Sequence, residues 1–312
     1  MKSILRLILK KIFSQYFLQF NEEIQKNRML MAKLLIRQVR ETKKIDGFRD
    51  VEFKAFSQNG EDGIIQYLLH KVPIENEVFI EFGVSNYQES NTRFLLLNDN
   101  WKGLVIDGSA ENIQSIKRDP IYWKHEITAQ SHFITKSNIN SIIAEAGVSG
   151  DIGLLSVDVD GNDYWVWEAI DVIQPRIVIS EYNSIFGDHQ PISVPYDENF
   201  VRTQAHHSGL FFGASLPALC LLAEKKGYDF VGSDSSGINA FFVRSDLDHE
   251  LACLSAQDGY VASRHREARD QNGRLTYTSG GDRYGLIEAM EVINVENNQI
   301  VRLGDAVTVG GK

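Results

Sequence analysis

The sequence predicts an α/β fold: an open, mostly parallel sheet of seven strands that ends in an antiparallel pair and is covered by helices. Three observations predict it. Short apolar runs bounded by turn residues recur along the chain, which is the pattern of strands buried on both faces of a parallel sheet. Helical segments alternate with these runs. The last two runs are joined by the short polar linker 233–237, so the final pair is hairpin-like and antiparallel.

The expected elements follow this alternation in order. Gly83 makes the turn after the first strand, and Gly227 stops the last helix. Residues 182–212 form a long, mostly irregular loop, which in a compact domain is usually functional. A hairpin is expected around residues 296–298. The expected strands are 78–82, 101–107, 121–127, 152–158, 176–180, 228–232 and 238–244, and the expected helices are 64–72, 91–97, 112–117, 137–146, 164–173 and 215–226.

Charge is distributed unevenly. Residues 1–44 hold 11 Lys and Arg against 3 Glu, a net of +8, so the other 268 residues carry −18 of the total of −10. An acidic body argues against nucleic acid as a partner, because that needs a basic face. The two cysteines, Cys220 and Cys253, fit a reducing compartment. Without a convincing signal or a run of about 20 apolar residues, a cytoplasmic protein is expected.

Residues 1–44 are expected to form two basic amphipathic helices broken near Asn21. The apolar face of residues 2–20, with cations beside it, is typical of a helix lying in a membrane surface, here the inner face. Packing on the domain or on a second subunit explains it as well. The second helix, with Leu30 and Leu34 on its stripe, is expected to pack or to form a homo-oligomer. Three regions follow: helices at 1–44, a main domain at 45–247 and a C-terminal extension at 248–312.

Residues 77–107 are the most informative segment. A glycine at the carboxyl end of a buried strand lets the backbone approach a ligand, and doubly wound sheets bind nucleotides there. Asp107 follows Gly83 by 24 residues and suits ribose hydroxyls. The turn lacks the other glycines of a pyrophosphate cradle, and Glu81 would repel phosphates. A cationic, nucleoside-containing cofactor such as S-adenosylmethionine (SAM) is therefore expected.

Acidic residues gather at the ends of two neighbouring strands. Asp158 and Asp160 follow one strand, and Glu181 and Asn183 follow the next. Three interpretations stay open: a divalent cation such as Mg held by Asp158, Asp160 and Glu181, a general base, or turn formation and helix capping. Histidines of the 182–212 loop, His206 among them, are alternative bases for a hydroxyl, although a surface role explains them equally well.

In combination these motifs resemble the FkbM-type SAM-dependent methyltransferases. The resemblance spans about residues 55–245 and implies a Rossmann-like class I methyltransferase sheet that transfers methyl groups to oxygen, as in members associated with glycan and natural-product modification. The matching motifs are Ser57-Gln58-x-Gly60-Glu61-Asp62, Phe79-Ile80-Glu81-Phe82-Gly83-Val84, Ser90-Asn91-Thr92, Trp101-x-Gly103-Leu104 and Leu155-Ser156-Val157-Asp158-Val159-Asp160-Gly161.

The resemblance also implies roles for single residues. Glu81 and Gly83 would hold the methionine end of SAM, and Asp107 the ribose. The expected cofactor-binding residues are Gln58, Glu81, Gly83, Ser85, Asn91, Asp107, Gly108, Ser109 and Asp158.

The expected function is O-methylation of a hydroxyl on a sugar or glycan precursor. Asp160 or His206 is expected to act as the base, and Glu181 with Asn183 to orient the acceptor. The alternative is a non-catalytic Rossmann-fold binding or scaffold protein that sits at the membrane in glycan assembly.

Overall fold

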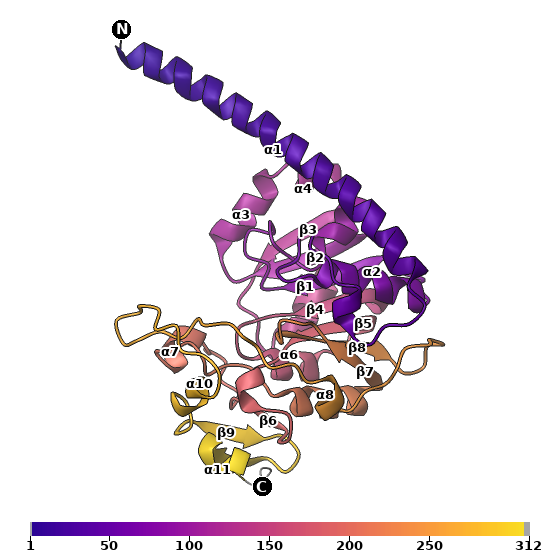
Figure 1. Ribbon diagram of the computed structural model, residues 1–312, viewed down its shortest axis with the longest axis vertical. Coiled ribbons are helices and arrows are strands. Elements are labelled where there is room, and N and C mark those ends of the chain that lie inside the picture. Colours follow the sequence, from indigo (N-terminus) through magenta and orange to yellow (C-terminus); the bar gives the residue numbers. More distant parts are fainter. Residues whose placement is uncertain (1, 309–312) are drawn as a thin grey trace.

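The computed structural model describes residues 2–308 and contains the predicted sheet (Figure 1). Its seven strands lie in the order β3-β2-β1-β4-β5-β8-β7. Neighbours are parallel except that β8 runs antiparallel to both β5 and β7, which confirms the predicted fold class. The strands are β1 (Val78–Phe82), β2 (Lys102–Asp107), β3 (Ile127–Ser131), β4 (Gly150–Val157), β5 (Ile173–Glu181), β7 (Tyr228–Ser233) and β8 (Asn239–Arg244).

Helices cover both faces of this sheet. Successive side chains of each strand point to opposite faces, so each central strand contributes apolar residues to both helical layers. In β1, Phe79 packs with one helical layer and Ile80 with the other. The first layer contains α1 (Lys2–Glu41), α2 (Glu61–Lys71), α3 (Ala110–Arg118) and α4 (Ile121–Lys124), and the second contains α5 (Ile139–Glu145), α6 (Asp163–Ala169) and α8 (Leu216–Lys226).

The N-terminal region is one helix, so the predicted break near Asn21 is wrong. An asparagine inside a helix costs less than about 1 kcal/mol, which does not interrupt it. Figure 1 shows the first half of α1 extending away from the sheet. The predicted membrane-facing side chains of residues 2–20 lie outside the described residues, apart from the exposed Tyr16 and Phe20. No helix in the described part of the chain is long and apolar enough to cross a membrane.

The second half of α1 packs through a different face from the predicted one. Ala32, Ile36 and Val39 are buried in the core. Leu30 and Leu34 of the predicted stripe are instead 62% and 65% exposed. The apolar stripe that the sequence assigned to packing or to a homo-oligomer therefore lies on the surface of the chain.

The segment predicted as the strand 121–127 begins as a helical turn. Pro120, with φ −52°, precedes the turn α4, because the proline ring fixes φ at a helical value. The strand β3 starts only at Ile127. Its alternation of buried Ile127 and Ala129 with exposed Thr128 is that of an edge strand with one face open to solvent. The predicted helix 164–173 also ends early, at Ala169, where β5 soon begins.

A small second sheet joins the long loop to the C-terminal extension. It has the order β10-β9-β6, and its hairpin turn falls at the predicted residues 296–298. A separate apolar cluster that includes Phe211 and Val292 lies beneath it. The strands are β6 (Ile192–Ser193), β9 (Glu291–Asn294) and β10 (Gln299–Arg302), and the short helical turns are η1 (Phe48–Asp50), η2 (Leu95–Asp99), η3 (Ser184–Phe186), α7 (Arg202–Ala205), α9 (Ala256–Gly259), α10 (Asp282–Gly285) and α11 (Leu303–Thr308).

Candidate functional site

Two adjoining cavities lie at the carboxyl ends of the central strands. The larger, of about 350 Å³, lies over β1, β4 and β5, and the smaller, of about 230 Å³, lies over β1 and β2. Gly83 and Asp160 line both cavities. From β1 the chain first adds β2 and β3 on one side of the sheet. It then crosses over and adds β4 and the later strands on the other side of β1. This reversal is the switch point at which open α/β sheets bind ligands.

Gly83 lets the backbone bend sharply between these cavities. Its φ is +69°, and a Cβ atom there would lie 2.0 Å from the carbonyl oxygen of Asp158. The ends of β1 and β4 therefore meet too closely for any side chain. Ser85, two residues later, also has a positive φ of 47°, which is unusual for a residue with a side chain.

The carboxylate of Glu81 holds the following loop in place. Its Oε2 accepts hydrogen bonds from Ser90 Oγ at 2.5 Å and from both the amide and the hydroxyl of Thr92, and Oε1 accepts one from the Asn91 amide at 2.8 Å. Burial raises the pKa of Glu81, and these bonds oppose the shift. Only Oε1, with one protein partner, has room for a ligand's donor.

Asp107 connects the glycine turn to the end of β2. Its Oδ2 accepts the Ser85 amide at 2.8 Å, and its Oδ1 accepts the Ser109 amide at 2.8 Å and Asn112 Nδ2 at 3.0 Å. Ser109 also caps α3. These bonds shape the smaller cavity, which Phe133 also lines with a side chain that is 53% exposed.

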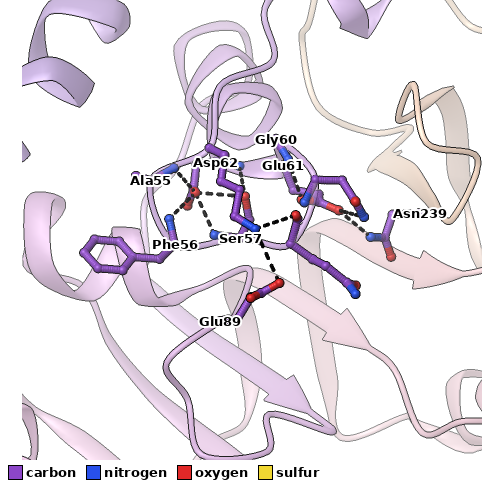
Figure 2. Close-up of polar contacts among 11 residues, drawn as sticks. Ala55, Phe56, Ser57, Gly60, Glu61, Asp62, Glu89 and Asn239 are labelled. Carbon is purple, nitrogen blue, oxygen red and sulfur yellow. Dashed lines mark hydrogen bonds and ion pairs between the residues drawn. The ribbon is translucent and has the colours of Figure 1, made fainter. Parts of the chain in front are cut away.

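The motif 57–62 forms a rigid support beside the larger cavity (Figure 2). The Oδ2 atom of Asp62 accepts four hydrogen bonds, from the amides of Ala55, Phe56 and Ser57 and from the Ser57 hydroxyl. The Ser57 hydroxyl in turn accepts the Asp62 amide in the first turn of α2, although the residue at the N-cap position of this helix is Gly60. Gln58, between these anchors, lines the cavity.

Three carboxylates, one buried and two half-buried, converge at the ends of β4 and β5. Asp158, Asp163 and Glu181 each place an oxygen within 4.8 Å of the others. Burial, followed by repulsion between these acids, raises the pKa values of Asp158 and Glu181 well above their usual range. Asp163 accepts the amides of Val159 and Gly161. Glu181 Oε2 is buried without a hydrogen-bond partner among the described residues.

Asp160 is not in this cluster, contrary to the predicted metal trio of Asp158, Asp160 and Glu181. Its backbone has φ +55°, and its side chain, 68% exposed, pairs with Arg202 at 3.1 Å. The left-handed backbone directs the carboxylate to α7. The acid that takes its place is Asp163, in the first turn of α6.

Two further predicted residues have other roles in the structure. Asn183 donates to the carbonyls of Leu210 and Phe212 and accepts the Ile185 amide, so it fixes the long loop, and its role toward an acceptor stays a prediction. His206 lies outside the lining of both cavities. Its Nδ1 lies 2.7 Å from Ser208 Oγ, and burial lowers its pKa.

The structure brings most of the predicted residues together. The larger cavity is lined by Gln58, Glu81, Gly83, Ser85, Asn91, Asp158, Asp160, Glu181 and Asn183, and the smaller by Gly83, Asp107, Gly108, Ser109 and Asp160.

Residues that sequence reasoning did not select, among them Arg202, His265 and Glu267, complete the larger cavity from the other side. Arg202 bridges Asp160 and Glu267, at 3.1 and 2.7 Å, and stacks 3.6 Å from the centre of the Phe212 ring. His265, from the C-terminal extension, lines the same wall. A single arginine in an irregular loop and one histidine in a tail give no local signal, because only tertiary folding brings them to the strand ends.

The strand order, the one antiparallel strand and the strand-end cavity define a Rossmann-like class I methyltransferase fold. No family model and no curated protein matches the chain. FkbM-type membership therefore stays a prediction.

Solved structures with a similar arrangement include the N-terminal domain of EvdMO1 with SAH bound (11% identity, TM-score 0.40, covering 68% of this chain and 94% of that one). PKMT2 from Rickettsia typhi in complex with AdoHcy is another (9% identity, TM-score 0.40, covering 64% and 55%). A SAM-dependent methyltransferase from Clostridium acetobutylicum ATCC 824 is a third (10% identity, TM-score 0.34, covering 54% and 83%). Sequence identities and TM-scores this low do not allow the activity of these proteins to be assigned to this chain.

Proposed function

We propose that the chain is a SAM-dependent O-methyltransferase of the FkbM type that acts on a hydroxyl of a sugar or glycan precursor. The observation that carries the proposal is the pair of cavities meeting at Gly83, with acids at both ends. The smaller cavity, with Asp107 at the end of β2, suits a nucleoside, and the larger accommodates a second reactant beside it.

The donor set fits a cationic cofactor. Asp158 and Glu181 face the larger cavity with raised pKa values, and Glu181 Oε2 lacks a protein donor. A positive ligand group would relieve their repulsion. Asp107, Gly83, Asn91 and Glu81 Oε1 would hold the nucleoside and amino-acid ends. When bound, SAM supplies a methyl group on a sulfonium that is open to in-line attack.

The protein's own task is then to orient the acceptor oxygen and take its proton. We assign the base to Glu181, in place of Asp160 or His206, because this residue lines the cavity and its Oε2 has no hydrogen-bond partner among the described residues. Most residues that line this cavity are polar or charged. Such a lining supports an acceptor with several hydroxyls over an apolar one.

Calorimetry and label transfer test this proposal. The full chain should bind SAM and its demethylated product, and should transfer labelled methyl to cell-envelope extracts. Glu181→Gln should keep SAM binding and lose transfer, whereas Glu145→Gln, on the exposed surface of α5, should change neither. Absence of SAM binding by the wild-type chain would refute the proposal, and binding without any transfer would favour the scaffold alternative.

A divalent cation is the second way to neutralise the cluster, favoured by the 4.8 Å convergence of Asp158, Asp163 and Glu181. Oxygen ligands of this kind suit Mg²⁺, which would lower the pKa of a bound hydroxyl. Titration of the chain with Mg²⁺ should give heat that Asp163→Asn abolishes, and chelation should stop transfer. If transfer is unchanged by chelation, the base mechanism stands alone.

A further inference from the structure

Helix α1 has two apolar faces, and the structure covers only one of them. Ala32, Ile36 and Val39 are buried against the domain. On the other side, large apolar side chains are 36–65% exposed. They are Phe20, Ile24, Leu30, Met31, Leu34 and Leu35.

The spacing of the uncovered face is that of a coiled-coil seam. Positions 20, 24, 27, 31 and 34 alternate steps of four and three, the repeat that keeps two helices in contact along one line. At roughly 100° per residue, this seam lies about 130° around the helix from the buried face. A second helix can therefore lie along α1 without displacing the domain.

We propose that this seam pairs with α1 of a second copy of the chain, parallel and in register. Residues flanking such a seam meet their partners five positions further along. Glu23 would meet Arg28 of the other copy, and Leu30 would meet Leu35. The first pair joins opposite charges, and the second joins two apolar side chains. Because the two copies are related by symmetry, each pair forms twice. Arg28 is already held beside the seam, 5.3 Å from the centre of the Phe56 ring.

Two features of this face favour a protein partner over a lipid surface. Asn27 interrupts the seam, and in a parallel, in-register pair it would face Asn27 of the other copy, so that its amide finds a hydrogen-bond partner that lipid does not offer. Glu23 flanks the apolar residues on one side and Arg28 on the other, and a second copy offers a partner for both charges, whereas anionic lipid favours cations alone. The copy–copy contact therefore concerns residues 20–35 and is separate from any role of residues 2–19.

Analytical ultracentrifugation of the full chain tests the pairing. The wild type should sediment as a concentration-dependent dimer. Replacing both Met31 and Leu34 with Glu should weaken the dimer by at least about tenfold, roughly the effect of 1.4 kcal/mol. Lys33→Glu, at an exposed position about 140° around the helix from the seam, is the matched control and should leave the dimer intact. Glu23→Lys and Arg28→Glu should each weaken it, and the two together should restore it.

Cross-linking fixes the orientation. In a chain with Cys253→Ser, Asn27→Cys should give an intermolecular disulfide under mild oxidation, and Lys33→Cys should not. A monomeric wild type at tens of micromolar overturns the proposal, as does a dimer that the seam variants leave unchanged. Equally, if seam variants abolish co-sedimentation with anionic vesicles while the chain stays monomeric, the face binds lipid and the proposal fails.

Discussion

Asn239 Nδ2 donates a hydrogen bond of 2.9 Å to Oε1 of Glu61, joining the start of β8 to the start of α2 across 178 residues of sequence (Figure 2). Glu61 also accepts the amides of Asn59 and Gly60. Both partners are nearly inaccessible to solvent. This contact holds the loop that carries Gln58 against the cavity wall.

Replacing Asn239 with Ala should therefore destabilise the protein. The buried Glu61 carboxylate loses a donor, and a hydrogen bond to a charged group is worth about 1.5–3 kcal/mol. Urea unfolding should show a loss of that size, together with weaker SAM binding. Gln174→Ala, at an exposed position of β5, is the control and should stay within about 0.5 kcal/mol of wild type.

A methyl group at position 83 should be intolerable. Gly83→Ala combines a positive φ with a Cβ only 2.0 Å from the Asp158 carbonyl, so the junction of β1 and β4 must open. The matched control is Gly147→Ala, where φ is +77° and no atom lies within 4 Å of the new Cβ. That control should lose only the roughly 1–2 kcal/mol of left-handed strain. Equal losses for the two variants would show that the close approach is unimportant.

Asp62 should make stability fall as the pH rises. Burial raises its pKa from 3.8 to about 6, so the folded state holds a proton that the unfolded state releases. The contribution is full below pH 4 and is lost as the pH passes 6. Asp62→Asn keeps an oxygen for the four donors and should remove this slope, a change of about 3 kcal/mol between the two limits. Urea midpoints from pH 4 to 7 measure it, and an unaltered slope would contradict the assignment.

Removing one acid from the cluster should separate stability from activity. Asp158 and Glu181 both have raised pKa values because they are buried and repel each other. Their stabilising contribution is therefore present at low pH and lost as the pH rises. At pH 8, Glu181→Gln should melt no lower than wild type although methyl transfer falls. A large loss of melting temperature would instead mean that the carboxylate stabilises the fold.

The sheet could be predicted from the sequence because its central strands are short apolar runs that end in glycine or acid. The edge strand β3 could not, since polar Thr128 and Gln130 alternate with its buried residues and the aromatic residues just before it suggest a strand instead. The low helix propensity of Asn21 also led to a wrong prediction, a break in α1, because a single unfavourable residue does not end a helix.

The site was predictable only as far as strand ends allow. Acids at the ends of β4 and β5 had to be neighbours because these parallel strands are adjacent in the sheet. The sequence does not show which of the acids point into the cavity, because that depends on the backbone conformation of each residue. Asp160, in a left-handed conformation, points outward to Arg202, and Asp163 points inward. His265 lies some 80 residues after Glu181, and nothing in the local sequence indicates that it returns to the same cavity.

The wall formed by the C-terminal extension has a consequence for biosynthesis. His265, Glu267 and Arg283 line the larger cavity, and the hairpin that follows them pairs with β6 of the preceding loop. On the ribosome, the sheet can assemble well before these residues emerge from the exit tunnel. A nascent chain would thus present a half-built pocket, and acceptor recognition would begin only after the last strands are synthesised.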